Sequence, residues 1–184
     1  MPLLLAFAGV LAIVFFMDKK TTSTAKSSPA AGKAGFFTQL RPVALAVERE
    51  TGIKSDLGMT QAAHESAYGT SQLATSAYNI FGFTAEIGTY WRSQGRPIYS
   101  VKTREFKAGL AYELVRPFRA YASWEESYRD WARLMQTPAY AHALLALRAG
   151  NLKAFSSALQ ITGYATDPNY ATKLEGVARA AGVA

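Results

Sequence analysis

The sequence predicts an α+β fold: a mostly helical domain with a small antiparallel β lobe, preceded by an N-terminal apolar helix. Three observations predict it. Apolar residues recur at helical spacing on both sides of the middle of the chain. Aromatic and β-branched residues, with Gly and Pro between them, gather over residues 79–121, and an uncharged run opens the chain. The 184 residues are 49% hydrophobic and 18% charged, which suits one globular domain rather than a disordered chain.

The N-terminal apolar run covers residues 2–17 and is followed at once by Asp-Lys-Lys. Sixteen helical residues span about 24 Å, less than the roughly 30 Å of the hydrocarbon core of a bilayer. A cleaved signal normally has basic residues before its apolar core, and none precede this one. We therefore expect residues 1–20 to form a membrane anchor or an uncleaved signal-like helix. Small polar residues with Pro and Gly predict a flexible linker over residues 21–35, and the domain then occupies residues 36–184.

Two helices and a short third one are expected next. Apolar residues at the i, i+3, i+4 and i+7 positions predict a first helix with one buried face: Leu40, Val43, Ala44 and Val47. Gly52 ends that helix. Ser55 is placed to cap a second helix, which runs toward Glu65 and stops near Gly69. A short helix is predicted over residues 71–77.

The middle of the chain predicts strands, and the rest predicts helices. The segments FGF, RPIYSVKTREF and PFRAYAS favour a small antiparallel sheet or an irregular hairpin. Residues 123–126, SWEE, form a capping box. The helix after it has apolar positions at Trp124, Tyr128, Trp131 and Met135. Asp167 is expected to cap the last helix, with Pro168 at its first position.

Composition excludes several classes of function. The absence of cysteine excludes a disulfide framework and a thiolate nucleophile. The two histidines, His64 and His142, lack ligand spacing, so neither a metal site nor a cofactor is predicted. The formal charge of +7 suits an anionic polymer such as nucleic acid or a bacterial cell wall, or solubility alone. Because the basic residues are scattered among acidic ones without a recognised binding motif, we expect no nucleic-acid partner.

Glu65 ends an alanine-rich stretch, immediately before the small residues and glycine that would stop a helix. A carboxyl among apolar neighbours keeps its proton to a higher pH, because burial disfavours the charged form. Glycosidic bond cleavage needs such a protonated carboxyl beside the leaving oxygen, and commonly a second carboxylate across the sugar. Glu65 is therefore a candidate general acid. The alternative is an ordinary solvated Glu near a helix end.

Residues 62–83, AAHESAYGTSQLATSAYNIFGF, resemble the signature of the endo-β-N-acetylglucosaminidases of bacterial autolysins and flagellar peptidoglycan hydrolases, glycoside hydrolase family 73. Three later blocks match in order: KTREF at 102–106, FRAYAS at 118–123 and GYATDPNYATKL at 163–174. The resemblance covers about residues 36–181. It implies a lysozyme-like domain in which the β lobe forms one wall of a cleft.

The resemblance also implies roles for individual residues. Glu65 matches the family's catalytic acid. Glu105 matches the second carboxylate, which activates water or stabilises the oxocarbenium ion. Tyr164 matches a tyrosine that lines the cleft and helps to position the substrate. Asn79 and Phe81 match the block that shapes the floor beside the acid.

Three aromatic residues complete the expected substrate-binding set: Tyr68 in the signature, and Tyr90 and Trp91, whose rings can stack on sugar faces. Neighbouring aromatics on a small β lobe are at least as often its core. Three other residues also have a structural alternative. Glu105 can be a charge-paired strand residue, Tyr164 a core tyrosine, and Asn79 a residue that braces a turn. Two carboxylates replace Glu105 if the alignment slips: Glu113 and Glu86.

The expected function is hydrolysis of the β-1,4 bond between N-acetylglucosamine and N-acetylmuramic acid in peptidoglycan, without a metal or cofactor. Residues 2–17 would hold the domain to a membrane, on the periplasmic or cell-envelope side. Two alternatives stay open. One is a lytic transglycosylase or muramidase, which cuts the alternate bond on the same fold. The other is a weakly catalytic, wall-penetrating component of a phage or secretion assembly, which would make the protein virion-associated.

Overall fold

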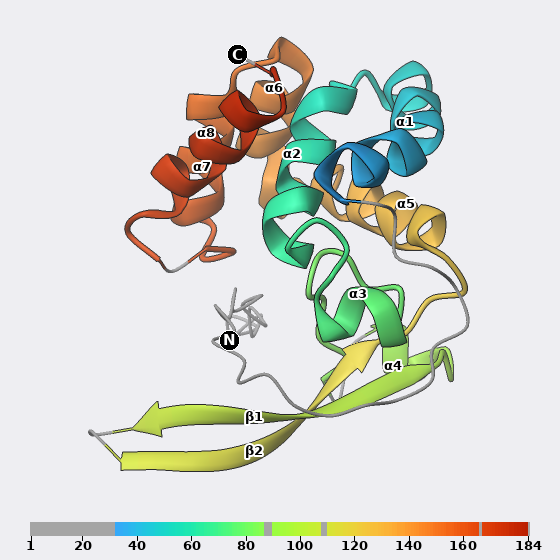
Figure 1. The fold of residues 1–184 in the computed structure, drawn as a ribbon, viewed down its shortest axis with the longest axis vertical. Coiled ribbons are helices and arrows are strands. Elements are labelled where there is room, and N and C mark those ends of the chain that lie inside the picture. The colour runs from blue at the N-terminus through green and yellow to red at the C-terminus, as the bar shows by residue number, and fades with distance from the viewer. Residues whose placement is uncertain (1–31, 87–89, 108–109, 166, 184) are drawn as a thin grey trace, which may run out of the picture.

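The computed structural model describes residues 32–86, 90–107, 110–165 and 167–183, with the backbone alone described for 103–107 and 110–112. This part of the chain is mostly helical and carries a two-stranded antiparallel sheet, as predicted (Figure 1). The elements in chain order are α1 Gly32–Thr51, α2 Ser55–Ser66, α3 Gln72–Ser76, α4 Tyr90–Ser93, β1 Ile98–Lys107, β2 Leu110–Arg119, α5 Trp124–Met135, the 3-10 helix η1 Pro138–Tyr140, α6 Ala141–Ala149, α7 Leu152–Ile161 and α8 Tyr170–Ala180.

Helix α1 begins earlier than predicted. The last four residues of the expected linker, 32–35, form its first turn. Lys33 lies over the ring of Tyr68 with its Nζ 4.7 Å from the ring centroid, which ties this turn to the end of α2. The predicted apolar face is buried, and Gly52 follows the helix with φ of +76°. The predicted anchor lies outside the described residues, and within them no helix is long and apolar enough to span a bilayer.

The predicted cap of α2 is wrong by one position. Ser55 is the first residue of the helix, and Lys54 is the N-cap without a capping side chain. The backbone N–H of Ser55 donates to Glu48 Oε2 at 2.9 Å, so a carboxylate from α1 satisfies the start of α2. Hydrogen bonds from Ser55 lower the pKa of Glu48 to about 2. The helix ends at Ser66 rather than near Gly69, because the next residue, Ala67, takes the left-handed conformation.

Helix α2 is the centre of the helical body, and nine of its 12 residues are buried. Figure 1 shows it between α1 and α5 on one side and α7 and α8 on the other. The closest approach is at Gly58, where an added Cβ would lie 2.0 Å from the hydroxyl of Tyr128 and 2.8 Å from the ring of Trp131. Only a residue without a side chain fits there.

Gly58→Ala is therefore expected to lower the free energy of unfolding by about 2 to 3 kcal/mol, because the methyl group overpacks the contact between α2 and α5. This loss exceeds the roughly 1 kcal/mol that Ala gains over Gly in a helix. Urea denaturation measures it. Gly176→Ala on α8 is the control, since nothing lies within 4 Å of its added Cβ, and that change should be neutral or stabilising. Equal midpoints for the two variants would contradict the packing argument.

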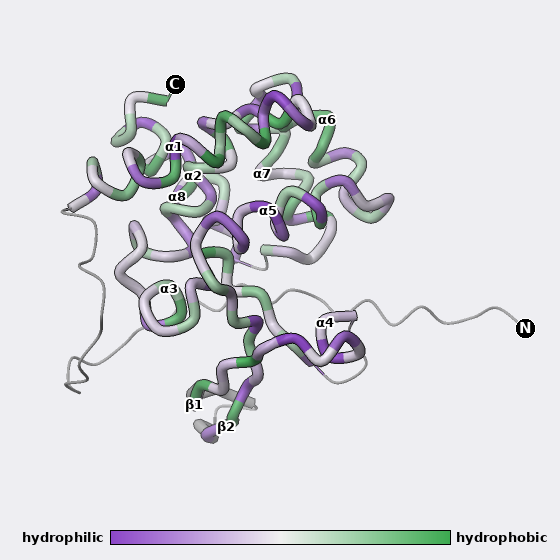
Figure 2. Tube along the Cα trace, turned by 90° about the vertical axis from the view of Figure 1, so that its right-hand side faces the viewer, coloured by the Kyte–Doolittle hydropathy of each residue, from purple (hydrophilic) through white to green (hydrophobic). Residues whose placement is uncertain are grey.

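The two strands form a hairpin, with Ile98 opposite Arg119 at one end and Lys107 opposite Leu110 at the other. Strand β1 confirms the prediction over RPIYSVKTREF. The predicted FGF segment is not a strand, and next to it Thr84 forms a single bridge with Phe118. Figures 1 and 2, turned by 90° from each other, both place the hairpin at the end of the molecule away from α6 and the C-terminus.

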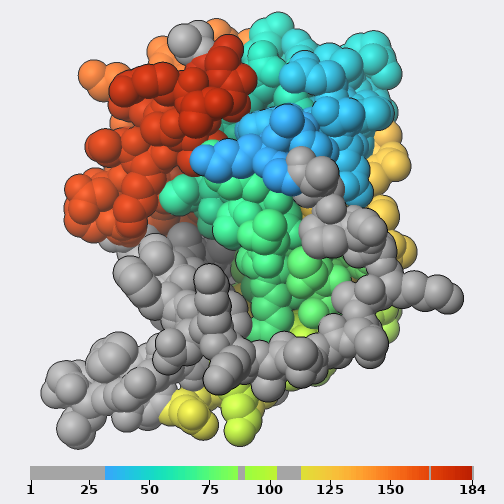
Figure 3. All heavy atoms as spheres, in the orientation of Figure 1, coloured from blue at the N-terminus to red at the C-terminus, as the bar shows by residue number. Residues whose placement is uncertain are grey.

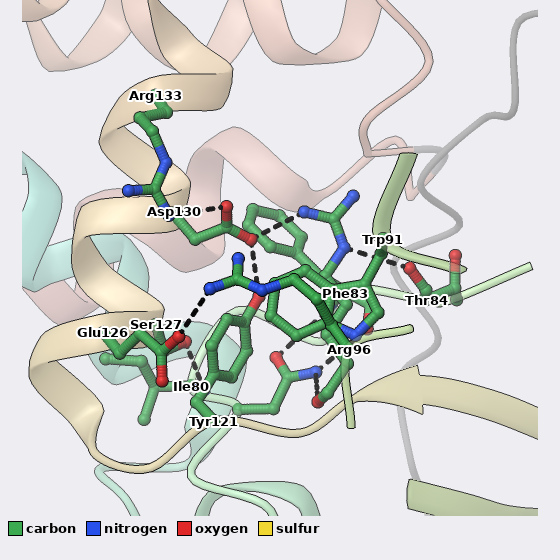
Figure 4. A network of polar contacts seen from close by, with 12 residues as sticks. Ile80, Phe83, Thr84, Trp91, Arg96, Tyr121, Glu126, Ser127, Asp130 and Arg133 are labelled. Atoms are coloured by element: carbon green, nitrogen blue, oxygen red, sulfur yellow. Dashed lines mark hydrogen bonds and ion pairs between the residues drawn. The ribbon is translucent and has the colours of Figure 1, made fainter. Parts of the chain in front are cut away.

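A polar network fixes the base of the hairpin to α5 (Figure 4). Arg119, the last residue of β2, pairs with Asp130 at 2.6 Å from Nη1 to Oδ2. The hydroxyl of Tyr121 donates to the same oxygen at 2.8 Å, and Arg133 binds the other oxygen at 3.1 Å. Burial alone would raise the pKa of Asp130, but the charge of Arg119 and these hydrogen bonds hold it below its ordinary value. The carboxylate therefore stays ionised between the base of the hairpin and α5.

The remaining two predicted caps differ in outcome. Ser123 caps α5 as predicted by accepting from Glu126 N at 3.2 Å, while Glu126 accepts from Ala122 N rather than from Ser123. The prediction for the last helix is wrong. Helix α8 begins at Tyr170, with Asn169 as its N-cap, and the carboxylate of Asp167 instead accepts from the N–H of Asn169 at 2.9 Å. Pro168 therefore precedes the helix.

Candidate active site

Glu65 lies one residue before the end of α2, whose C-terminal end points toward the hairpin in Figure 1. The side chain is partly buried, and its Oε1 accepts a hydrogen bond from the hydroxyl of Tyr170 at 2.9 Å. Burial raises the pKa of Glu65 to about 7, against the opposing effect of that hydrogen bond. Near neutral pH a large share of this carboxyl therefore keeps a proton, which is the state that a general acid needs.

Tyr170 is in turn held from the core. Gln61 donates to its hydroxyl at 3.3 Å and accepts from the indole N–H of Trp131 at 2.8 Å. None of these three residues was predicted from the sequence as part of the site. Gln61 carries a sequence signal, because it precedes Glu65 by four positions and so shares its helix face. Tyr170 lies within the last block of the resemblance, six residues after Tyr164.

Tyr164 lies near the acid but is 1% exposed. Its hydroxyl donates to the backbone oxygen of Phe81 at 3.4 Å. Burial raises its pKa well above the ordinary value, and the nearby charge of Glu65 adds to that effect. The structure thus places Tyr164 near Glu65. The tyrosine is a buried core residue, as its structural alternative predicts.

His64, the neighbour of the acid, packs edge-on against Tyr170 with 5.3 Å between ring centroids. Its pKa is lowered by burial first and by the charge of Lys173 second, while Asp167 opposes both. The residue thus lies on the α8 side of α2 as a mostly neutral ring. Within the described ranges no three His, Cys, Asp or Glu side chains are grouped to hold a metal ion.

Glu105 lies on β1, opposite Tyr112 of β2. Its side chain is outside the described part of the structure, so its pairing with Glu65 across a sugar stays a prediction. The two substitutes also belong to the β lobe. Glu86 pairs with Arg116 at 3.5 Å, and Glu113 lies opposite Arg104 in the strand register.

Three expected substrate-binding side chains are buried and have structural partners. Asn79 donates to the backbone oxygens of Phe83 and Arg119, each at 2.9 Å, and accepts from Phe83 N at 3.1 Å. Phe81 stacks on Trp131 with ring centroids 5.1 Å apart. The indole N–H of the third, Trp91, donates to the backbone oxygen of Pro97 at 2.7 Å. These contacts match the turn-brace and core alternatives: they support the site from inside the protein.

The other two expected substrate-binding residues reach the surface. Tyr90 is 75% exposed at the start of α4. Tyr68 is partly buried and has a left-handed φ of 57°. It lines a pocket of about 410 Å³ between α1, α2 and the end of α8, whose other lining residues are Lys33, Ala34, Phe37, Thr38, Arg41, Asp56, Met59, Ala180, Ala181 and Val183. Figure 3 shows the surface where α1 (blue) and α8 (red) meet. Glu65 does not line this pocket.

Comparisons with known proteins give a consistent assignment. The glucosaminidase family model, described as mannosyl-glycoprotein endo-beta-N-acetylglucosaminidase, matches residues 41–182. "Peptidoglycan hydrolase FlgJ" of Salmonella typhimurium is 33% identical over 159 residues, which cover 83% of this chain and 48% of that protein. "Probable N-acetylmuramidase" of Lactococcus lactis is 33% identical over 175 residues, covering 91% of this chain and 38% of that protein.

A solved structure agrees with these matches. The crystal structure of a peptidoglycan hydrolase mutant from Sphingomonas sp. A1 superposes with a TM-score of 0.63 at 32% identity, over 79% of this chain and 92% of that one. The chain thus spans about half or less of the length of the two curated relatives, but nearly the whole of this solved chain.

Proposed function

Because the chain belongs to the glucosaminidase family, we propose that it hydrolyses the β-1,4 bond between N-acetylglucosamine and N-acetylmuramic acid in peptidoglycan. Glu65 donates the proton to the leaving oxygen. One observation carries the proposal: a partly buried carboxyl at the end of α2 has its pKa raised to about 7 and accepts a hydrogen bond from Tyr170. The names of the relatives above support peptidoglycan as the substrate.

We further propose a lysozyme-like arrangement in which the hairpin β1–β2 forms the wall of the substrate cleft opposite Glu65. The anchoring of its base to α5 through Arg119 and Asp130 supports this role, because it holds the strands to the helical body. Glu105 on β1 then acts as the second carboxylate, and Tyr164 supports the acid from behind. Exposed Tyr90 and partly buried Tyr68 are the remaining candidates for sugar contact.

The pH dependence of the reaction is expected to follow Glu65. The carboxyl is protonated below its pKa of about 7 and ionised above it, so kcat/KM falls as the pH rises through that value. The rate of clearing of a peptidoglycan suspension, measured between about pH 5 and pH 9 at constant ionic strength, gives the profile. A rate that does not decline on the alkaline side would contradict the assignment of Glu65 as the acid.

Glu105→Gln is expected to lower the rate by about 10²-fold or more if Glu105 activates water or stabilises the oxocarbenium ion. Glu125→Gln, at an exposed carboxylate on α5, is the control and is expected to keep activity. A loss in Glu113→Gln, on the paired strand, without one in Glu105→Gln would move the role to Glu113. Full activity of Glu105→Gln would favour a lytic transglycosylase, which generally needs one catalytic carboxyl, or a reaction assisted by the acetamido group of the substrate.

The identity of the released fragments tests the proposed bond. Peptidoglycan is digested with the wild-type protein, reduced with borohydride and analysed by mass spectrometry. Reduced N-acetylglucosamine ends are expected. Reduced N-acetylmuramic acid ends would assign a muramidase. This outcome is included because the Lactococcus lactis relative is named a probable N-acetylmuramidase. Anhydro ends would assign a lytic transglycosylase.

We propose a cell-envelope location, with residues 2–17 as a membrane anchor, on the uncharged composition of that run. Assembly into a phage or secretion apparatus is the alternative. Fractionation of cells that express the full chain distinguishes them, because an anchored protein sediments with membranes and is released by detergent but not by salt.

A further inference from the structure

A chain of three hydrogen bonds runs from the core of the protein to the carboxyl of Glu65. The indole of Trp131 donates to Gln61 Oε1 at 2.8 Å, and Gln61 Nε2 donates to the hydroxyl of Tyr170 at 3.3 Å. The hydroxyl donates to Glu65 Oε1 at 2.9 Å. The three inner side chains are at most 2% exposed, so the chain links α5, α2 and α8 away from bulk water.

The indole fixes the direction of this chain, because its N–H can only donate. The amide of Gln61 must therefore turn its oxygen toward Trp131 and its NH₂ group toward Tyr170. The phenol oxygen then accepts from Gln61, and its single hydrogen is left for Glu65. The opposite direction would set an indole hydrogen against an amide hydrogen, both buried and unpaired, at a cost of about 1 to 3 kcal/mol for each unsatisfied group.

We infer that Trp131, Gln61 and Tyr170 are positioning residues that hold Glu65 Oε1 as an acceptor and leave Oε2 as the oxygen that carries the transferable proton. The inference rests on the proposed function, in which Glu65 is the general acid. A protonated Oε1 would accept from Tyr170 more weakly than a carbonyl oxygen does, so the hydrogen bond favours the proton on Oε2, which presents it to a glycosidic oxygen. The direction of donation thus selects one of two chemically equal oxygens.

Other titratable groups surround this carboxyl. From the segment before α8, Tyr164 faces it with a hydroxyl that donates to the backbone of Phe81. From α2, His64 touches the ring of Tyr170, and Lys173 and Asp167 act electrostatically on His64. A test must therefore change the chain while leaving these charges in place, which removal of a hydroxyl or an indole N–H does.

The experiment reads the carboxyl of Glu65 directly by ¹³C NMR titration of protein labelled at glutamate side chains, with the resonance assigned by its loss in Glu65→Gln. Tyr170→Phe is expected to raise the pKa of Glu65 by about one unit, because it removes a donor that favours the charged form. Trp131→Phe is expected to raise it by a smaller amount, since the amide of Gln61 is then free to turn around.

A double-mutant cycle decides between a directed chain and simple packing. In the directed chain, the effect of Trp131→Phe travels through the hydroxyl of Tyr170, so it vanishes in the Tyr170→Phe background. An equal shift in both backgrounds, or no shift from Trp131→Phe alone, overturns the inference. If Trp131→Phe does not fold, Gln61→Met interrupts the same link and enters the same cycle.

Tyr128→Phe is the matched control. Its hydroxyl donates to the backbone oxygen of Ser55 at 3.4 Å, and its ring lies 5.2 Å from that of Trp131, so it belongs to the same aromatic cluster but not to the chain. This variant is expected to leave the pKa of Glu65 unchanged, and a shift as large as that of Tyr170→Phe overturns the inference.

The titration needs no substrate, so the two proposals fail separately. A coupled pKa shift in a protein that releases no fragment from peptidoglycan upholds the chain and removes the proposed function. Full hydrolytic activity with additive pKa shifts upholds the proposed function and overturns the directed chain. In an active protein the alkaline limb of kcat/KM is expected to move to higher pH in Tyr170→Phe by the amount that NMR gives.

Discussion

Glu65→Gln is expected to lower the rate of peptidoglycan digestion by about 10²- to 10⁴-fold, which is the contribution of general acid catalysis. The amide keeps the shape of the side chain and an oxygen that accepts from Tyr170, but it has no proton to give to the leaving oxygen. The turbidity of a suspension of bare peptidoglycan measures the rate. The thermal unfolding midpoint of the variant is expected to equal or exceed that of the wild type, because a buried ionisable group becomes neutral.

Glu125→Gln is the control for this change. Glu125 is an exposed carboxylate in the first turn of α5 that pairs with Arg129, so the same chemical substitution there is expected to leave the rate unchanged. Near-normal digestion by Glu65→Gln would remove the central assignment. A comparable loss in both variants would show that the assay reports charge rather than catalysis.

Asp130→Ala is expected to lower the free energy of unfolding by about 3 kcal/mol or more. The change leaves the guanidinium of Arg119 and the buried hydroxyl of Tyr121 without their shared acceptor at the base of the hairpin. Urea denaturation measures the loss. Glu50→Ala is the control: it breaks an exposed ion pair with Arg129, a class that contributes at most about 1 kcal/mol.

The contribution of Asp130 also has a definite dependence on pH. The pKa of Asp130 is lower in the folded protein than its ordinary value of 3.8, so its stabilising effect is complete above that value and is lost as the pH falls through the folded pKa. Asp130→Asn stays neutral throughout. The gap in unfolding free energy between the wild type and this variant is therefore expected to be constant near neutral pH and to shrink below about pH 4. A gap that does not shrink as the pH falls below about 4 would contradict the ion-pair explanation.

Local patterns predicted most of the elements. The apolar spacing of α1, the capping box of α5 and the β-rich composition around β1 each reflect the conformational preference of a few neighbouring residues. The observed elements agree with these preferences. The caps of α2 and α8 were missed for a physical reason. The first N–H of α2, that of Ser55, is satisfied by a carboxylate from α1, and α8 starts two residues later than its Asp-Pro signal indicates.

Part of the surroundings of Glu65 was predicted from the sequence. Glu65 was identified because a carboxyl at the end of an apolar helix is unusual, and a short stretch of sequence is enough to show it. Tyr170 and Trp131 were not, because they lie 105 and 66 residues from it along the chain, and only the tertiary fold brings them into one hydrogen-bond chain with it. Asn79 and Phe81 were recognised as special, but their contacts show why such residues also recur in a fold without touching a ligand: they brace a turn and fill a core.

The abrupt end of α2 has a consequence for the electrostatics of catalysis. The aligned peptide dipoles of a helix leave a partial negative charge of about half an elementary unit at its carboxyl end. Glu65 sits in that last turn, so the local potential disfavours its anion and helps it to keep a proton. In the proposed reaction the same potential would attract the positive charge that develops on a sugar ring as its bond breaks, so the left-handed turn at Ala67 that ends the helix would assist both partners.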